Sequence, residues 1–70
     1  MKNSNMIIKT LIFSNSKALC NIFTIQGLSI PSFGETANAL TFKDDAAAEL
    51  VLNRIPKNIR DTCNLQKFVF

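Results

Sequence analysis

The stretch MIIKTLIFSNSKALCNIFTI, residues 6–25, carries the strongest strand signal in the chain. Residues 6–13 and 18–25 are rich in β-branched and aromatic side chains, which favour β-strands. Residues 14–17 between them are polar and of the kinds that form turns. Two strands joined by such a short polar break are typical of an antiparallel hairpin.

Both expected strands are largely apolar on both faces. Along residues 6–13, alternation puts Leu11 and Phe13 on one side. It puts Ile8 and Ile12 on the other side. Because one helix covers only one face of a small sheet, we expect the opposite apolar face to be uncovered. An uncovered apolar face marks a protein-binding or dimerisation surface.

Residues 26–42 give weaker signals. Gln26-Gly27 predicts a turn, and residues 28–30 are either a short extension or a third strand that ends at Pro31. Residues 32–36 (SFGET) are expected to form a loop, because Ser and Gly follow directly after a proline. Residues 37–42 (ANALTF) are either a strand or a turn that leads into the next element.

A helix is expected directly after this segment. Asp44 is a suitable N-cap, since its carboxylate accepts hydrogen bonds from amides of the first helical turn. Asp45 and Glu49 lie near the positive end of the helix dipole. Apolar residues recur at helical spacing and form one stripe suited to covering a sheet: Ala48, Val51, Leu52 and Ile55.

The remainder of the chain predicts a final strand. Pro56 disfavours helical backbone at the residue before it, so it stops or kinks the helix. Residues 57–64 (KNIRDTCN) are expected to be a polar connection that holds one more helical turn, anchored by Ile59. Residues 65–70 (LQKFVF) are expected to form a strand beside one of the first two.

These elements predict a small α+β domain of the order β-β-(β)-α-β. Its antiparallel sheet of three to four strands has one helix packed on one face. A chain of 70 residues forms one domain at most, so residues 6–70 are expected to be that domain and residues 1–5 (MKNSN) a flexible N-terminus. Its core is small, and association with a partner or a second copy would stabilise it.

The composition excludes several kinds of catalytic and metal site. The chain has no His and two Cys, which leaves no zinc site of the usual N/S kind, no Ser-His-Asp set and no Cys-His pair. The pair Asp44-Asp45 is better explained by helix capping than by acid–base chemistry. Gly27 and Gly34 stand apart, without phosphate-loop spacing. We therefore expect no catalytic, cofactor-binding or metal-binding residue, and no enzyme.

The cysteines and the N-terminal region predict a cytoplasmic protein. Cys20 and Cys63 are expected to be reduced, small core residues, since disulfide-held mini-domains carry more cysteines and an export signal. The apolar run 6–13 is interrupted by Lys9 and is too short for a signal sequence. Lys17 breaks the lipoprotein-like run before Cys20. No apolar run approaches the roughly 20 residues that span a bilayer.

The charge of +3 is distributed unevenly. Residues 1–20 hold three Lys and no acid, residues 21–53 hold one Lys against four acids, and residues 54–70 hold four basic residues against one acid, giving +3, −3 and +3. If the two ends meet in space, a basic face results that attracts nucleic acid or an acidic surface. The candidate contacts are Lys9, Lys17, Arg60 and Lys67.

The six phenylalanines are mostly expected in the core, because a chain of this length needs its large side chains inside. Stacking of nucleic-acid bases on Phe23 and Phe68 is the alternative, but no RNA-binding aromatic pattern is present. Phe33, in the expected loop beside Gly34, is the phenylalanine best placed to be exposed. It is the candidate anchor of an interface.

The segment ALTFKDDAAAE, residues 39–49, followed by Leu52 and Ile55-Pro56, resembles a pattern of small phage and prophage proteins. In these, an Ala-x-x-Phe step leads into a capped helix with Ala six residues after the Phe, and a short strand follows. Phe42 and Ala48 match this spacing, and the resemblance covers residues 37–70. The resemblance implies a small phage-type or mobile-element protein. Such proteins are often non-enzymatic inhibitors or modulators of host machinery, including anti-CRISPR and anti-restriction proteins. A DNA mimic would be strongly acidic, which this chain is not.

Three functions of different classes follow. The leading one is a small cytoplasmic protein that binds a host protein complex and inhibits or modulates it, anchored by the apolar sheet face or Phe33. The second is a basic nucleic-acid-binding module that uses the four cations named above. The third is a homodimeric structural or regulatory subunit whose sheet face is self-complementary.

Overall fold

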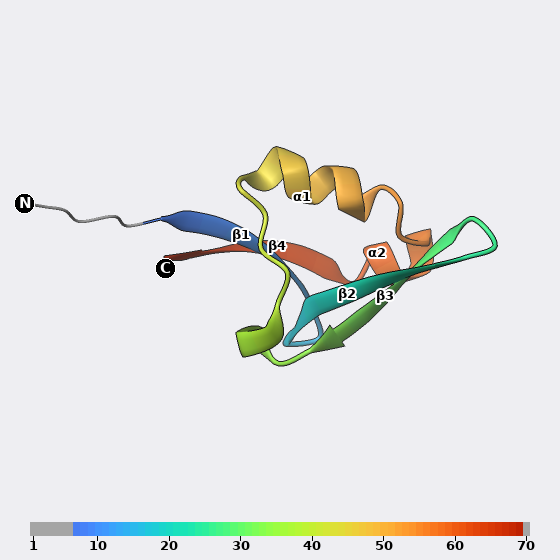
Figure 1. Cartoon of the computed structure of the whole chain (residues 1–70), viewed down its shortest axis with the longest axis horizontal. Coiled ribbons are helices and arrows are strands. Elements are labelled where there is room, and N and C mark those ends of the chain that lie inside the picture. The colour runs from blue at the N-terminus through green and yellow to red at the C-terminus, as the bar shows by residue number, and fades with distance from the viewer. Residues whose placement is uncertain (1–6, 70) are drawn as a thin grey trace, which may run out of the picture.

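The structure is a computed structural model that describes residues 7–69. These residues form a sheet, two α-helices and a short 3-10 helix (Figure 1). In chain order the elements are β1 (Ile8–Ser14), β2 (Lys17–Ile25), β3 (Leu28–Gly34), η1 (Thr36–Asn38), α1 (Asp45–Leu52), α2 (Lys57–Arg60) and β4 (Cys63–Val69). The expected flexible terminus 1–5, together with Met6 and Phe70, lies outside the described residues.

The four strands form one antiparallel sheet in the order β3-β2-β1-β4. β1 pairs with β4 over its whole length, from Ile8 opposite Val69 to Ser14 opposite Cys63. The closing strand therefore lies beside the first strand. The predicted α+β architecture, an antiparallel sheet with one main helix, is confirmed.

Two-residue turns join the first three strands. In the first turn φ is 51° at Asn15 and 69° at Ser16. In the second it is 51° at Gln26 and 80° at Gly27. Positive φ at both central residues defines type I′ turns, whose twist matches that of the strands they join. The expected hairpin around residues 14–17 and the expected turn at Gln26-Gly27 are both confirmed.

β3 is longer than the sequence indicates. The expected end of the strand at Pro31 and the expected loop over 32–36 are wrong for residues 31–34, which continue β3. Ile25 and Leu28 flank the turn as a hydrogen-bonded pair, and alternation along the ladder then turns the Pro31 nitrogen toward the outer edge. Because β3 is an edge strand, the missing N–H breaks no bond to a neighbouring strand.

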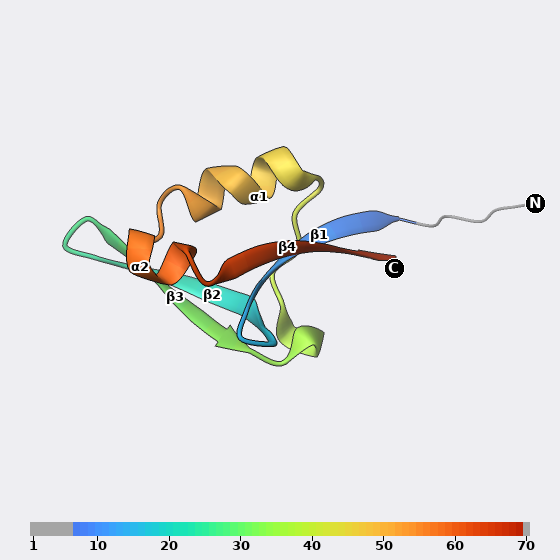
Figure 2. The same ribbon diagram turned by 180° about the vertical axis from the view of Figure 1, so that it is seen from behind.

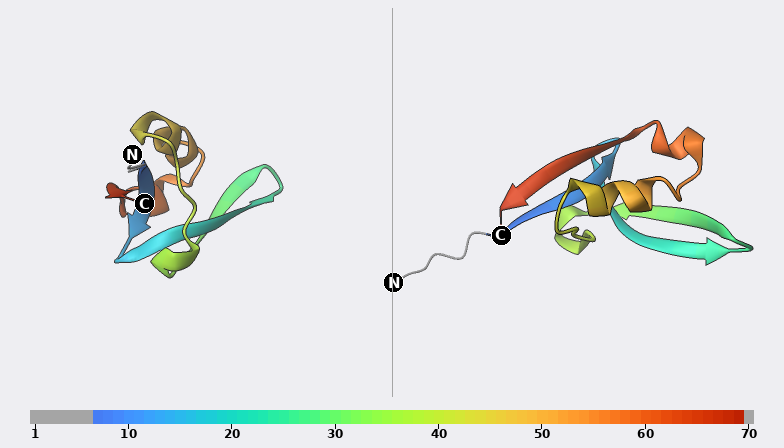
Figure 3. Two further views of the ribbon diagram at one scale, coloured as in Figure 1. Left: turned by 60° about the vertical axis from the view of Figure 1, so that its left-hand side comes forward. Right: turned by 90° about the horizontal axis from the view of Figure 1, so that it is seen from above.

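The sheet divides into two halves between β1 and β2. These strands pair only at Phe13 with Ala18 and at Ser14 with Lys17. Beyond these pairs the β2–β3 hairpin diverges from the β1–β4 pair (Figures 1 and 3). A bulge between Leu19 and Asn21 shifts the register of β2 against β3 at the same place. Residues 21–32, the part of the hairpin beyond this bulge, are called the arm below.

Residues 39–42 cross the space between the two halves. The Leu40 amide donates to the Leu19 carbonyl over 2.9 Å. Phe42 exchanges two backbone hydrogen bonds with Thr10, of 2.8 and 2.9 Å. Of the two alternatives left open for residues 37–42, the structure therefore has a connection with a single bridge rather than a strand.

α1 begins where the sequence predicts. Asp44 is the N-cap, since its Oδ1 accepts from the Ala47 amide over 2.9 Å. Asp45 joins the helix to the sheet, because its Oδ1 accepts from Thr10 Oγ1 over 2.9 Å. The predicted apolar stripe is buried or half-buried throughout: Ala48, Val51, Leu52 and Ile55.

Buried side chains lie on both faces of β1. On the α1 side, one cluster joins Ile12 and Leu19 of the sheet to Ala48 of the helix. On the other side, a second cluster joins Leu11, Phe13 and Ala18, with Ala39 and Phe68 packed against it. Figure 2 shows α1 on one side of the strands and η1 on the other.

The expectation of an uncovered sheet face opposite the helix is wrong for β1. On that face Leu11 is 0% exposed and Phe13 is 7% exposed. The Phe13 and Phe68 rings stack with centroids 5.7 Å apart, and the connection after η1 supplies Ala39. Residues 39–42 pass through the gap where the two halves diverge, so on this face the large apolar side chains of β1 are covered and those of the arm remain exposed.

Candidate protein-binding surface

An exposed apolar patch lies on one face of the arm. Phe23 is paired with Ile30, and Ile25 with Leu28, in the β2–β3 ladder. Alternate residues of paired strands share a face, so these four side chains lie side by side. Their exposed fractions are 51% and 37% for the first pair, and 57% and 59% for the second. We call Phe23, Ile25, Leu28 and Ile30 the hairpin patch.

The opposite face of the hairpin is anchored to the core. Leu19, Ile22 and Phe33 belong to the cluster under α1, either as members or packed against it. Ile22 lies opposite Pro31 and Phe33 opposite Leu19, on the face away from the hairpin patch. The patch is therefore the outer face of a hairpin that the core holds at its base.

Beyond Lys17, its first residue, the hairpin is also uncharged. Residues 18–34 contain no Asp, Glu, Lys or Arg, while the chain outside them holds all eight basic and all five acidic residues. Depletion of charge together with exposed large apolar and aromatic side chains is the composition of the centre of a protein interface. Single exposed apolar residues are common, whereas contiguous ones mark interaction sites.

Phe33 does not lie where the sequence reasoning placed it. It is in β3 rather than in a loop, and it is half-buried against the cluster of Ile12, Leu19 and Ala48. Its predicted role as an exposed anchor is therefore replaced by a role in the core. The exposed residues could have been predicted from another pattern. Large apolar residues alternate from Phe23 to Ile30 around the Gln26-Gly27 turn.

The first and last strands pair with each other, but this pairing does not bring Lys9 and Lys67 onto one face. Lys9 lies opposite Phe68 in the β1–β4 ladder, and Lys67 lies opposite Thr10. The two lysines therefore project from opposite faces of the sheet. Lys67 Nζ lies 3.8 Å from Asp45 Oδ2, at an exposed position where such a pair contributes little.

Lys17 and Arg60 lie toward the other end of β1. Ser14, the last residue of β1, pairs with Lys17 on one side and with Cys63 on the other. Arg60 ends α2, just before β4 begins at Cys63. The four candidate cations are thus distributed over both ends of β1, and the geometry does not unite them in one basic face.

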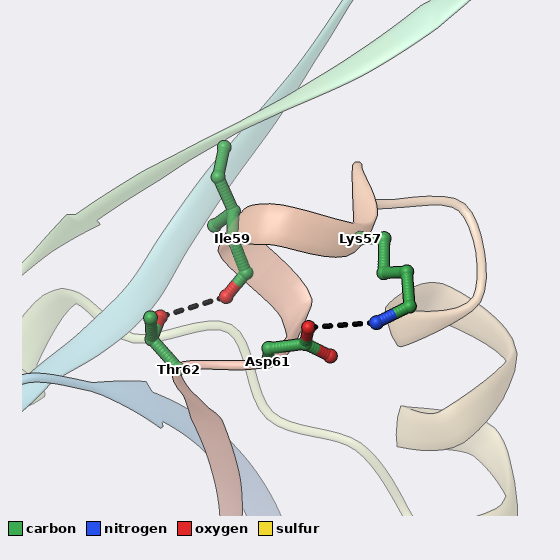
Figure 4. A network of polar contacts seen from close by, with 4 residues as sticks. All are labelled: Lys57, Ile59, Asp61 and Thr62. Carbon is green, nitrogen blue, oxygen red and sulfur yellow. Dashed lines mark hydrogen bonds and ion pairs between the residues drawn. The ribbon is translucent and has the colours of Figure 1, made fainter.

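Polar contacts within residues 57–62 tie α2 to the turn that follows it (Figure 4), and a further contact reaches Ser14 at this end of the sheet. Thr62 Oγ1 donates to the Ile59 carbonyl over 2.7 Å and lies 2.6 Å from Ser14 Oγ. Lys57 Nζ pairs with Asp61 Oδ2 over 2.9 Å on the exposed side of the turn. The predicted single turn of helix anchored by Ile59 is confirmed, and Ile59 is half-buried.

The two thiols are free and half-buried, and Cys63 packs against the cluster of Ile12, Leu19 and Ala48. Cys20 Sγ lies 3.4 Å from the carbonyl oxygens of Ala18 and Glu35, beside the bulge. Cys63 Sγ lies 3.4 Å from the Ile59 carbonyl oxygen. Burial raises the pKa of the Cys63 thiol, and hydrogen bonds from neighbouring hydroxyls offset part of this rise. A raised pKa keeps the thiol protonated and unreactive at neutral pH.

Residues 7–69 enclose no pocket and hold no group of three or more His, Cys, Asp or Glu placed to bind a metal. Across the same residues, no helix combines the length and the apolar character needed to span a bilayer. No family model, curated protein or solved structure matches the chain. The hairpin patch is therefore assigned from the structure of this chain alone.

Proposed function

We propose that this chain is a non-enzymatic binding protein that docks on another protein through the hairpin patch. The observation that carries the proposal is a set of four adjacent large apolar side chains, 37–59% exposed, within residues 18–34, which hold no charged residue. Transfer of such a side chain from water to a fully buried site is favourable by about 1.5–3 kcal/mol. Because these side chains are about half exposed, roughly half of that free energy is still available to binding at each position.

The chemistry of the arm also indicates the kind of partner. A nucleic acid is bound chiefly through cations that neutralise its phosphates, and the arm has none. The complement of the hairpin patch is an uncharged apolar groove on a protein. The lysines and arginine at the ends of β1 add long-range attraction to an acidic partner surface.

The resemblance of residues 37–70 to phage and prophage proteins supports a more specific form of the proposal. In this form the chain acts in the host cytoplasm, binds one component of a host protein complex and inhibits or modulates it, as anti-CRISPR and anti-restriction proteins do. Such a protein acts stoichiometrically, because binding itself is the whole of its activity.

The proposal is tested by capture with matched variants. Phe23→Ser combined with Ile25→Ser removes half of the hairpin patch. Leu50→Ser is the control, since Leu50 is 69% exposed on α1 and lies outside the patch. We expect a protein captured from host lysate by the native chain and by the Leu50 variant, and lost with the double variant. Equal capture by all three contradicts a role for the patch.

A salt titration separates this function from nucleic-acid binding. We expect no binding to DNA or RNA duplexes and single strands at low salt. Binding that falls steeply with salt, and that Lys9→Gln and Lys17→Gln both weaken, would instead establish the nucleic-acid function.

A further inference from the structure

The two edges of the sheet differ in how they are protected against pairing. On β3, Pro31 has no N–H to offer, and a bulge interrupts the ladder beside it. β4 has neither a proline nor a bulge, and its ladder to β1 is continuous from Cys63 to Val69. No segment within residues 7–69 pairs with the outer side of β4 (Figure 3).

The hydrogen bonds of Thr10 show which groups of β4 face outward. Thr10 exchanges both of its backbone hydrogen bonds with Phe42, on the side of β1 away from β4. Thr10 and Lys67 are therefore a non-hydrogen-bonded pair, and alternation directs the N–H and C=O groups of every second residue to the outer edge. These residues are Cys63, Leu65, Lys67 and Val69.

We propose that two copies of the chain pair antiparallel through these outer edges of β4. The two-fold axis passes through Gln66, so that Leu65 of one copy lies opposite Lys67 of the other, and Cys63 opposite Val69. The outward groups then form up to about eight N–H···O=C bonds, and the two sheets become one. This contact is isologous and closes with two copies.

Two features of β4 favour this register. An axis at Leu65 or Lys67 leaves one end of the strand unpaired, and an axis at Lys67 sets two ammonium groups directly opposite each other. An axis at Gln66 pairs the whole strand and brings two side-chain amides together, each able to donate and to accept. Lys67 already lies 3.8 Å from the Asp45 carboxylate, which offsets the remaining repulsion across the axis.

The pairing also covers apolar surface that one copy leaves exposed. Val69 is 60% exposed and would lie opposite Cys63 of the second copy. The arm lies at the opposite edge of the sheet, so the hairpin patch stays free in the dimer. Dimerisation and binding through the patch are thus separate properties, and either can fail alone.

The mass of the native chain in solution is the first test. Light scattering across a concentration series should give twice the 7.8 kDa of one chain at high concentration, with dissociation on dilution. Gln66→Lys places like charges across the axis and should weaken the dimer about fivefold. A monomer at every concentration overturns the proposal, whatever the variants do. A dimer that Gln66→Lys leaves unchanged overturns the register.

A cross-link tests the axis directly, in a background where both native cysteines are replaced by Ser. The Cα atoms of a non-hydrogen-bonded pair are about 4.5 Å apart, within the range a disulfide spans. Gln66→Cys should therefore give a disulfide-linked dimer on mild oxidation. Asn64→Cys is the control, because its two copies would be separated by about 13 Å along the strands. Equal cross-linking of both variants, or none with Gln66→Cys, contradicts the register.

Discussion

The two halves of the sheet differ in burial and in charge. In the β1–β4 half, residues 10–14 are all buried, and Asp45 and Thr62 bond to the side chains of Thr10 and Ser14. In the arm no residue is buried, no residue is charged, and the side chains of the hairpin patch face outward. The contrast shows that stability is concentrated around β1, while the arm presents surface that folding does not use.

The largest expected effect comes from truncating the centre of the core. Ile12 is 0% exposed between β1 and α1, and Ile12→Ala should lower the free energy of unfolding by about 2–5 kcal/mol. Ile25 is 57% exposed on the arm, and Ile25→Ala should change the free energy of unfolding by only about 0.5 kcal/mol. Chemical denaturation of both variants measures the difference. Similar losses would mean that the arm is part of the core.

A smaller loss is expected at the helix that covers β1. Asp44→Ala removes the cap bond to the Ala47 amide and should lower the free energy of unfolding by about 1 kcal/mol. Asp44→Ser keeps an accepting oxygen and should restore most of the loss. Thermal and denaturant unfolding report both values. If Ser rescues nothing, the loss comes from charge rather than from capping.

A change in the turn of the arm tests whether the arm opens independently of the rest of the sheet. Gly27 has φ of 80°, and Gly27→Ala should cost about 1 kcal/mol because an L side chain is strained there, although its Cβ would meet nothing within 4 Å. Because only the base of the hairpin packs against the core, the amides of the arm should exchange through an opening that leaves β1 folded, and faster than the amides of β1, in the native chain and in the variant. Equal protection of both halves would show that they unfold as one unit.

The matched change at the other turn should act in the opposite direction. Ser16 has φ of 69° without being glycine, at the junction of the two halves. Ser16→Gly relieves this strain and should raise the global free energy of unfolding by about 0.5 kcal/mol. A loss of stability would contradict the type I′ geometry of this turn.

The smallest effect is a pH dependence that belongs to the β1–β4 half. Burial raises the pKa of Cys63 above its ordinary value of 9.0, so the folded chain holds the thiol proton to higher pH than the unfolded chain does. Its contribution to stability is present in full below that ordinary value and is lost as pH rises through the folded pKa. Cys63→Ser should flatten this alkaline decline. The arm has no titratable side chain, and an unaltered decline in the variant would place its cause elsewhere.

Local patterns were enough to predict most of the elements. The strand signals in residues 6–13 and 18–25 and the cap at Asp44 depend on near neighbours, and the structure has strands at Ile8–Ser14 and Lys17–Ile25 and the N-cap at Asp44. The stripe from Ala48 to Ile55 is buried or half-buried as expected, but α1 ends at Leu52, so Ile55 lies beyond the helix. The extent of β3 could not be predicted in this way. Pro31 ends a central strand but not an edge strand, and which of these β3 is depends on the order of strands in the sheet.

The sequence predicts that an exposed apolar surface exists, but not which residues form it. An exposed apolar surface follows from two strands that are apolar on both faces, but its position depends on which of those faces the rest of the chain covers. Phe33 was expected outside and lies half-buried against the core. Leu11 and Phe13 were expected on the open face and are covered by Ala39 and Phe68. Lys9 and Lys67 lie at neighbouring positions of the β1–β4 ladder, and alternation places their side chains on opposite faces of the sheet.

The sequence by itself determined most of the segments that become strands and helices, where the main helix begins, and that residues 18–34 carry no charge. Each of these follows from the side chains and their spacing. Only the tertiary structure decided that β1 and β2 separate after two residue pairs. That separation lets residues 39–42 pass through the gap between Leu19 and Thr10, with Ala39 packed against the second face of β1. It also leaves Phe23, Ile25, Leu28 and Ile30 in solvent. Burial is decided by what lies against a surface, and for this chain the covering segments come from distant parts of the sequence.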